Sequence, residues 1–236
     1  MSQLEHILLD VSASPLIDQG QWDEACHLLL SSLQAGLQVA RVSLWFYVDD
    51  GKVMQCQTML DHGLICQEET KLDALVFPRY FAALRTERAI VAHDAQQDDK
   101  TSEFTELYLK PKGISAMLDL PVRHFGRMIG IICCEHIGTN RHWQDDEVRF
   151  AAGLADQVGR AMNAAQYRQA QQQLESLNQQ LEQRVELRGL QLADNNKTIA
   201  RAHEQLLVQA KLATLGGIVA GVAHEVSTPL GVAVTA

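Results

Sequence analysis

Two hydrophobic periods divide the first two thirds of the chain into helices and strands. Apolar residues recur at helical spacing in 20–38, 77–87 and 144–164, which predicts three amphipathic helices. A Ser-Glu-Phe-Thr-Glu start predicts a further short helix at 102–109. Apolar runs of strand length cover 41–60 (two strands), 89–95, 115–122 and 127–137. Asp-Asp-Gly within the first of these segments, and Arg-His-Phe-Gly between the last two, are hairpin turn signals.

Strands that pair through hairpins, with helices at both ends, predict an α+β fold built on an antiparallel sheet flanked by helices. Composition then changes near residue 165: nearly all aromatic residues and all but one proline precede this point. The segment that follows is rich in Gln, Leu, Glu and Arg. We therefore predict a folded domain with N-terminal helices over 1–164, a long helix over 165–208, and a distinct last segment over 209–236.

The long helix carries the heptad spacing of a coiled coil. Its seam runs through Leu174, Leu177, Leu181, Val185, Arg188, Leu192, Asn195, Ile199, Ala202 and Leu206. One extra four-residue step between Leu177 and Val185 is a stutter, which locally unwinds a supercoil. Polar seam residues weaken pairing but help to fix register and strand number. We expect a parallel homodimer; a single solvated helix is the alternative. About fifty residues at ~1.5 Å each give a rod on the order of 75 Å.

Charge and cysteine content narrow the function classes. A formal charge of −9 argues against nonspecific binding to nucleic acids or to anionic membranes. No uninterrupted apolar run approaches the length of a membrane span, and the N-terminus does not have the pattern of a signal peptide. Five cysteines without a Cys-x-x-Cys spacing indicate reduced thiols. We expect a cytoplasmic protein without a membrane span, a nucleic-acid partner or a bound metal.

The first domain resembles the GAF family, the small-molecule-binding or dimerising modules of signalling proteins. The matching pieces, in order, are ARVSLWFY, YFAALRTERAIVAHDAQQDD, TSEFTELYLKPKGISAMLDLPV, GRMIGIICCEH and RHWQDDEVRFAAGLADQVGRAM. The resemblance implies the GAF fold over about 20–164. It leaves the ligand open, because the Asn-Lys pair of cyclic-nucleotide-binding members does not precede Asp146 and Glu147, and none of Cys66, Cys133 and Cys134 has the context of a bilin attachment site.

A ligand pocket in this fold is expected between the sheet and the segment 77–110. The candidate ligand-binding residues are Tyr80, Phe81, His93, Asp94 and Asp119. Ordinary packing in the core and in loops is the alternative role for each of them. Haem would require an axial histidine, for which His93, His124 and His136 are the candidates. A haem or flavin redox sensor is therefore a further alternative, which the colour of the purified protein distinguishes.

A cluster of reactive side chains interrupts the apolar segment 211–236. His224 and Thr228 are four residues apart and share a helix face, and Glu225 is adjacent. A solvent-facing imidazole is a competent nucleophile, and a neighbouring carboxylate can orient it and raise its basicity. Pro229 removes a backbone hydrogen bond, so the helix should bend there. Thr228 stands where the zinc-binding His-Glu-x-x-His signature requires histidine, so zinc is set aside.

The stretch KLATLGGIVAGVAHEVSTPLG resembles the H-box of sensor histidine kinases, in their dimerisation and phosphoacceptor (HisKA) domain. The resemblance implies that His224 is the phosphoacceptor and Glu225 its acid/base partner. Thr228 is then expected to position water for the phosphatase step and Pro229 to act as a helix hinge. The implied partners are a second copy of the chain and a response regulator, whose aspartate receives the phosphate.

The kinase family's second dimerisation helix and ATP-binding domain are expected after residue 236. ATP and Mg²⁺ are implied for that domain, and 1–236 alone is expected to be inactive. Two function hypotheses follow: the sensory and phosphoacceptor region of a cytoplasmic two-component histidine kinase, or a non-catalytic GAF regulator that binds a ligand and dimerises. The His-Glu-x-x-Thr-Pro pattern favours the first, since dimerisation alone does not need these residues.

Overall fold

A computed structural model describes the backbone of residues 2–49, 51–66 and 70–233, and side chains as far as residue 223. The chain divides into two compact units, Met1–Gln172 and Gln173–Ala236. Helix α5, Asp145–Ala233, begins in the first unit and contains the described part of the second. Each unit is described separately below.

The first unit is built on one antiparallel sheet with long and short strands, in the order β3-β2-β1-β7-β6-β5. The short strand β4 also pairs with β2. The strands are β1 (Arg41–Asp49), β2 (Val53–Asp61), β3 (Leu64–Cys66), β4 (Lys71–Asp73), β5 (Ile90–Ala92), β6 (Ile114–His124) and β7 (Arg127–Ile137). The predicted α+β fold with an antiparallel sheet is confirmed.

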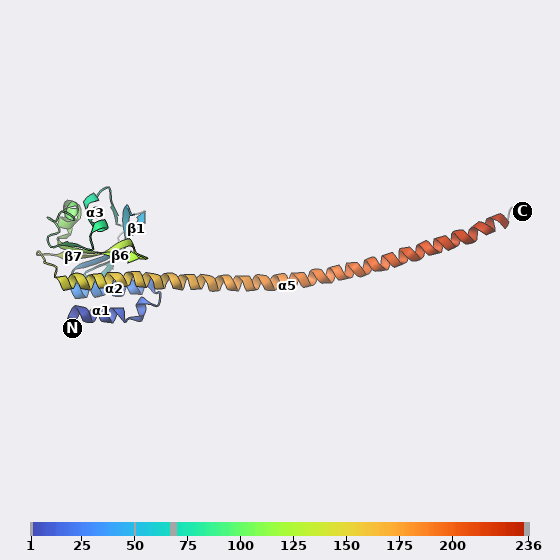
Figure 1. The fold of residues 1–236 in the computed structure, drawn as a ribbon, viewed down its shortest axis with the longest axis horizontal. Coiled ribbons are helices and arrows are strands. Elements are labelled where there is room, and N and C mark those ends of the chain that lie inside the picture. The colour runs from blue at the N-terminus through green and yellow to red at the C-terminus, as the bar shows by residue number, and fades with distance from the viewer. Residues whose placement is uncertain (1, 50, 67–69, 234–236) are drawn as a thin grey trace. The chain divides into compact units, whose positions relative to one another are not determined.

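Helices cover both faces of this sheet (Figure 1). One face packs against α1 (Gln3–Ser12), α2 (Trp22–Leu37) and the first turns of α5, and a short 3₁₀ helix, Pro15–Ile17, connects α1 to α2. The other face packs against α3 (Pro78–Thr86) and the segment 102–112. Each face therefore has its own hydrophobic core, and alternate residues of the central strands point into each core.

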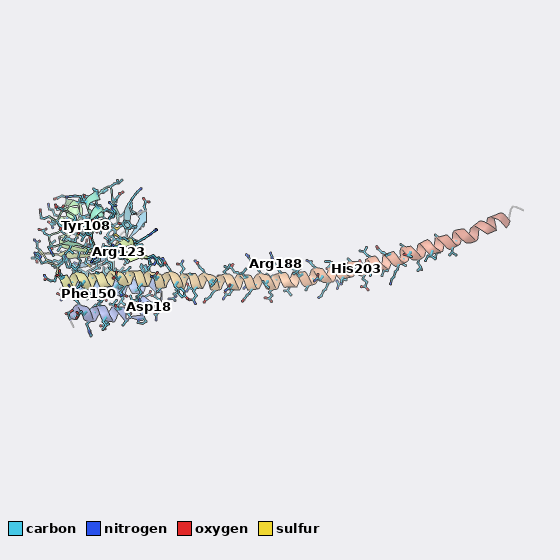
Figure 2. All side chains as sticks on the ribbon, viewed as in Figure 1. Asp18, Tyr108, Arg123, Phe150, Arg188 and His203 are labelled. Carbon is cyan, nitrogen blue, oxygen red and sulfur yellow. The ribbon has the colours of Figure 1, made fainter. Side chains whose placement is uncertain are left out.

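The segment 102–109 differs from its prediction as a short α-helix. It forms a 3₁₀ turn, Ser102–Phe104, followed by a π-helix, Thr105–Leu109, and then the short α4, Lys110–Lys112. Apolar spacing alone does not distinguish these windings, because side chains three, four and five residues apart lie on overlapping faces. The π-helical turn places Tyr108 over the sheet, where it joins the polar network described below (Figure 2).

One glycine in the central sheet is required by close packing. A Cβ atom built on Gly130 of β7 would lie 1.9 Å from the backbone oxygen of Trp45 in β1, far inside van der Waals contact. Gly130 pairs with Phe46 in the ladder between these strands. The residue therefore permits a close backbone approach at this point of the sheet.

In the second unit, the described side chains of α5 are exposed, including Arg188 and His203 (Figure 2). The exposed large apolar residues at the predicted seam are Leu174, Leu177, Leu181, Val185, Leu192, Ile199 and Leu206. By length and composition alone, α5 contains a stretch apolar enough to cross a membrane, which is weak evidence for a span.

Candidate functional site

A cavity of about 200 Å³ lies between the sheet and the helical segments α3 and 102–109. Strands β1, β4, β6 and β7 contribute to its wall, together with α3 and the 3₁₀ and π turns. Its surface is mostly apolar. The lining residues are Trp45, Thr70, Lys71, Leu72, Phe77, Tyr80, Phe104, Leu107, Tyr108, Met117, Ile131, Cys133 and Glu135.

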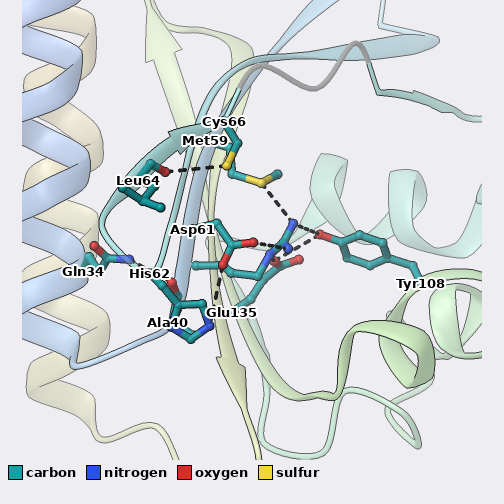
Figure 3. A network of polar contacts seen from close by, with 10 residues as sticks. Gln34, Ala40, Met59, Asp61, His62, Leu64, Cys66, Tyr108 and Glu135 are labelled. Atoms are coloured by element: carbon teal, nitrogen blue, oxygen red, sulfur yellow. Dashed lines mark hydrogen bonds and ion pairs between the residues drawn. The ribbon is translucent and has the colours of Figure 1, made fainter.

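Glu135 joins this wall to a buried ionic network centred on Arg41. Nε of Arg41 donates to Glu135 Oε2 at 2.9 Å, and Nη1 donates to Asp61 Oδ2 at 2.7 Å. Nη2 of the same guanidinium contacts Tyr108 Oη at 3.3 Å and Met59 Sδ at 3.0 Å. In Figure 3, Asp61, Glu135 and Tyr108 approach one another from three sides. Arg41 of β1 thus links its own strand to β2, to β7 and to the π-helix.

The protonation of the network follows from burial and from its charges. Burial alone would lower the pKa of Arg41, but Tyr108, Glu135 and Asp61 outweigh it and hold the guanidinium charged. Burial raises the pKa of Glu135, and the positive charge of Arg41 opposes that rise. Tyr108 donates its hydroxyl hydrogen to Glu135 Oε2 at 3.1 Å, and burial followed by the Glu135 charge raises the pKa of Tyr108. The network is a charged arginine shared between carboxylates.

Asp119 is a second buried acid, immediately behind the cavity wall. It is fully buried on β6, and its Oδ2 accepts a 2.6 Å hydrogen bond from the hydroxyl of Tyr80, a lining residue. Its Oδ1 has no hydrogen-bond partner among the described residues. Burial raises the pKa of Asp119 to about 7, and hydrogen bonds from the Cys133 thiol and the Tyr80 hydroxyl act in the opposite direction. This carboxyl group is therefore poised to change charge near neutral pH.

The structure separates the five predicted pocket residues into three places. Tyr80 lines the cavity and Asp119 lies directly behind it. Phe81 is fully buried in the core on the same face, without lining the cavity. His93 Nδ1 accepts the backbone N–H of Trp143 at 3.0 Å, and its ring stacks on His142 at 4.3 Å. Asp94 lies at the start of a turn, where its backbone oxygen accepts hydrogen bonds from the N–H groups of residues 97 and 98.

The sequence does not predict the remaining wall residues as ligand-binding residues, and of these it offers only Cys133 for consideration, as a bilin attachment site. The aromatic lining residues come from three separate segments, which are β1, α3 with its N-cap residue, and 102–109, and only the fold shows that they meet. A signal for the ionic network was nevertheless present, because Arg41, Asp119 and Glu135 are charged residues inside otherwise apolar strands. Buried charges are rare unless they are paired, so such residues mark a network or a site.

A larger groove of about 710 Å³ contains three arginines, Arg85, Arg123 and Arg127. These side chains are exposed, so water screens their charge and competes for their hydrogen bonds. The smaller, aromatic-lined cavity has the character of a small-molecule site, because such sites are concave, mostly apolar and carry a few fixed polar groups.

The predicted phosphoacceptor cluster lies outside the described side chains. Helix α5 is assigned through Ala233 and so includes the backbone of His224, Glu225, Thr228 and Pro229, but their side chains are not described. Among described residues, no group of three or more His, Cys, Asp or Glu side chains is placed to hold a metal ion.

Comparison with known proteins shows the family. The GAF domain model matches residues 21–162. The fold is similar to the GAF domain of a phosphoenolpyruvate-protein phosphotransferase (ptsP) from Coxiella burnetii, with 19% identity, TM-score 0.51, and coverage of 71% of this chain and 94% of that chain. No match was found among curated proteins.

Two light-absorbing proteins have a similar fold. The blue-light absorbing form of the Thermosynechococcus elongatus PixJ GAF domain is 19% identical, with TM-score 0.51 and coverage of 73% of this chain and 95% of that one. The phytochrome photosensory core module of Stigmatella aurantiaca is 13% identical, with TM-score 0.55 and coverage of 69% and 36%. At these identities the likeness concerns the fold alone. With the family match over more than half of its length, the chain belongs to the GAF domain family, whose members are sensory and regulatory domains.

Proposed function

We propose that this chain is the sensory and phosphoacceptor region of a two-component sensor histidine kinase. The observation that carries the proposal is the attachment of an H-box-like sequence to a GAF domain through one helix. Helix α5 begins at Asp145, within the GAF match that ends at residue 162, and is assigned as helix through Ala233, past His224. A kinase input region requires a sensory domain and a histidine that can be phosphorylated. In this chain, helix α5 connects the two.

The chemistry assigned to the cluster is a phosphoryl transfer. The imidazole of His224 attacks the γ-phosphorus of ATP, an N–P bond forms, the bond to the bridging oxygen breaks, and ADP leaves. Glu225 accepts the imidazole proton. In the second transfer, an aspartate of a response regulator attacks the phosphohistidine and the N–P bond breaks. Thr228 positions water for hydrolysis of the resulting aspartyl phosphate, and Pro229 lets the helix bend between these states.

ATP and Mg²⁺ would be bound by a separate ATP-binding domain rather than by the GAF domain. The exposed apolar seam of α5 supports a homodimer, in which the two phosphoacceptor segments would lie side by side.

The test is transfer of radiolabelled phosphate from ATP by a separately purified histidine-kinase ATP-binding domain. We expect label on the 1–236 chain, and none without the added domain. The label should be lost in acid and stable in base, as for a phosphohistidine. His224→Gln should abolish labelling, whereas His203→Gln, which changes an exposed histidine on the same helix, should leave it unchanged.

Labelling that survives His224→Gln would contradict the assignment. Labelling of neither protein, with a dimeric and folded chain, would favour the second hypothesis, a non-catalytic GAF regulator. The cavity between the sheet and α3 supports ligand binding under both hypotheses.

A further inference from the structure

The cavity beside Tyr80 and Tyr108 is unusual in its charge balance. Its walls are mostly apolar, yet Glu135 lines it and Asp119 lies one hydrogen bond behind Tyr80. Both acids are almost completely buried. Buried carboxylates are costly unless a cation or hydrogen-bond donors compensate them, so the distribution of nearby positive charge indicates what the cavity can accept.

Nearby positive charge does not balance these acids. Arg41 is shared between Glu135 and Asp61, at 2.9 Å and 2.7 Å, so it neutralises only one of the two. Asp119 accepts hydrogen bonds from the Tyr80 hydroxyl and the Cys133 thiol, two neutral donors, and no cation is paired with it among the described residues. Lys71 also lines the cavity, but its side chain is exposed and water screens its charge.

Aromatic rings form much of the remaining wall. Phe104 packs against Phe77 at 4.3 Å and against Tyr80 at 4.8 Å between ring centroids, and Trp45 and Tyr108 also line the cavity. The faces of aromatic rings carry partial negative charge and attract ammonium and guanidinium groups. An aromatic wall with excess buried carboxylate is thus complementary to an organic cation, and it repels an anion.

We propose that this cavity binds a small organic ammonium ion, with its charged nitrogen toward Glu135 and its apolar body against the aromatic wall. This inference rests on the proposed sensory function, and it gives the chemical class of the signal. A cavity of about 200 Å³ is smaller than the roughly 300–1,000 Å³ typical of drug-sized ligands. The ligand is therefore a compact amine with about one ring or an equivalent aliphatic group.

The test compares three probes of nearly equal shape and different charge. Benzylamine, which is protonated at neutral pH, benzyl alcohol and benzoate are titrated into the 236-residue chain by calorimetry. The fluorescence of Trp45, a lining residue, provides a second readout. We expect benzylamine to bind at least about tenfold more tightly than benzyl alcohol, because one desolvated contact of a cation contributes about that much affinity. Benzoate should not bind detectably.

Two variants locate the effect. Burial raises the pKa of Asp119 to about 7, so the variants are compared at pH 8, where this carboxylate is ionised. Asp119→Asn removes that negative charge, keeps the side-chain shape and retains an oxygen for Tyr80, so it should reduce the preference for benzylamine several-fold. Glu175→Gln neutralises an exposed carboxylate of the second unit and should change nothing. Circular dichroism and thermal unfolding establish that both variants are folded.

Equal binding of the three probes, tighter binding of benzoate, or no binding of benzylamine at millimolar concentration would overturn the proposal. If folded Asp119→Asn kept the full preference for benzylamine over benzyl alcohol, Asp119 would have no role in binding the cation. Binding is measured without ATP or phosphotransfer, so failure here leaves the role of His224 to the labelling experiment. Conversely, loss of the phosphoacceptor assignment would leave a positive binding result in place.

Discussion

The hydroxyl of Tyr80 on α3 donates a 2.6 Å hydrogen bond to Asp119 on β6, and both side chains are buried. The bond links the helix over the cavity to the centre of the sheet. Because burial raises the pKa of Asp119 to about 7 from an ordinary value of 3.8, the folded protein holds a proton there that the unfolded chain has lost at intermediate pH.

Folding stability should therefore depend on the ionisation of Asp119. Between about pH 4 and pH 7 the native state binds more protons at this site than the unfolded state, so stability falls as pH rises through that window. Asp119→Asn removes this contribution. We expect the variant to gain stability relative to the parent as pH rises from about 5 to about 8, by on the order of one to a few kcal/mol. Urea unfolding at several pH values measures the difference.

The groups facing Asp119 do not obscure this comparison. Burial raises the pKa values of Tyr80 and Cys133 well above their ordinary values, so both stay protonated throughout the range. Glu135, whose pKa burial also raises, adds a slope of the same sign to both proteins. Parallel stability profiles for parent and variant would contradict the assignment of this titration to Asp119.

Removal of the Arg41 side chain should be strongly destabilising. Arg41→Met leaves Glu135 buried without its cation, and the loss of one partner of a buried ion pair costs about 3–5 kcal/mol. The double variant Arg41→Met/Glu135→Gln removes the stranded charge and should recover a large part of the loss. Lys110→Met breaks an exposed pair with Glu106 and should cost less than about 1 kcal/mol.

Chemical unfolding of the four proteins completes this double-mutant comparison. Equal losses for Arg41→Met and Lys110→Met would show that the network contributes no more than a surface pair. No recovery in the double variant would mean that the packing of the arginine side chain, rather than its charge, supports the fold.

Gly130 provides a test of the close approach between β1 and β7. In Gly130→Ala the new Cβ would lie 1.9 Å from Trp45 O, so the two central strands must separate. We expect a loss of several kcal/mol, because backbone displacement in a central sheet belongs to the most damaging class of substitutions. Gly189→Ala, where a Cβ meets no atom within 4 Å, should leave the thermal transition of the GAF domain unchanged. A Gly130→Ala protein with unaltered thermal stability would show that the two strands are not so tightly apposed.

Much of the fold follows from local periodicity, and the differences have physical reasons. The long strands and amphipathic helices carry repeated apolar positions, so their place along the chain could be predicted. Strands β3 and β4 contain three residues each, too few to show a period, and they exist because β2 offers them a pairing edge. The π-helix at Thr105–Leu109 shares its apolar spacing with an α-helix.

The candidate site was predictable only where one residue stood out alone. The sequence predicts Tyr80 and Asp119 as candidate ligand-binding residues, and the fold brings them into contact. The pairing of Arg41 with Glu135 joins residues 94 positions apart, and no local pattern specifies such a pair. His93 lies in a loop after β5, where its contact with Trp143 depends on the path of the chain before α5.

The exposed seam of α5 yields the last prediction, that the chain is a homodimer held by a coiled coil. Leu181 and Leu192 are exposed seam residues, and aspartate at both would place charge in the apolar interface. We expect Leu181→Asp/Leu192→Asp to weaken dimerisation by more than tenfold, measured by analytical ultracentrifugation across micromolar concentrations. Leu190 is similarly exposed but lies off the seam, so Leu190→Asp should leave the dimer intact.

The comparison with Leu190→Asp separates a specific seam from general hydrophobic association. If all exposed leucines contributed equally, a single off-seam charge would weaken the dimer by about half as much, in free energy, as the double seam substitution. A heptad interface predicts no such effect, because residues opposite the seam face water in both monomer and dimer. A parent chain that is monomeric at these concentrations would contradict the predicted homodimer. A dimer that survives both seam substitutions would place the dimer interface outside the seam of α5.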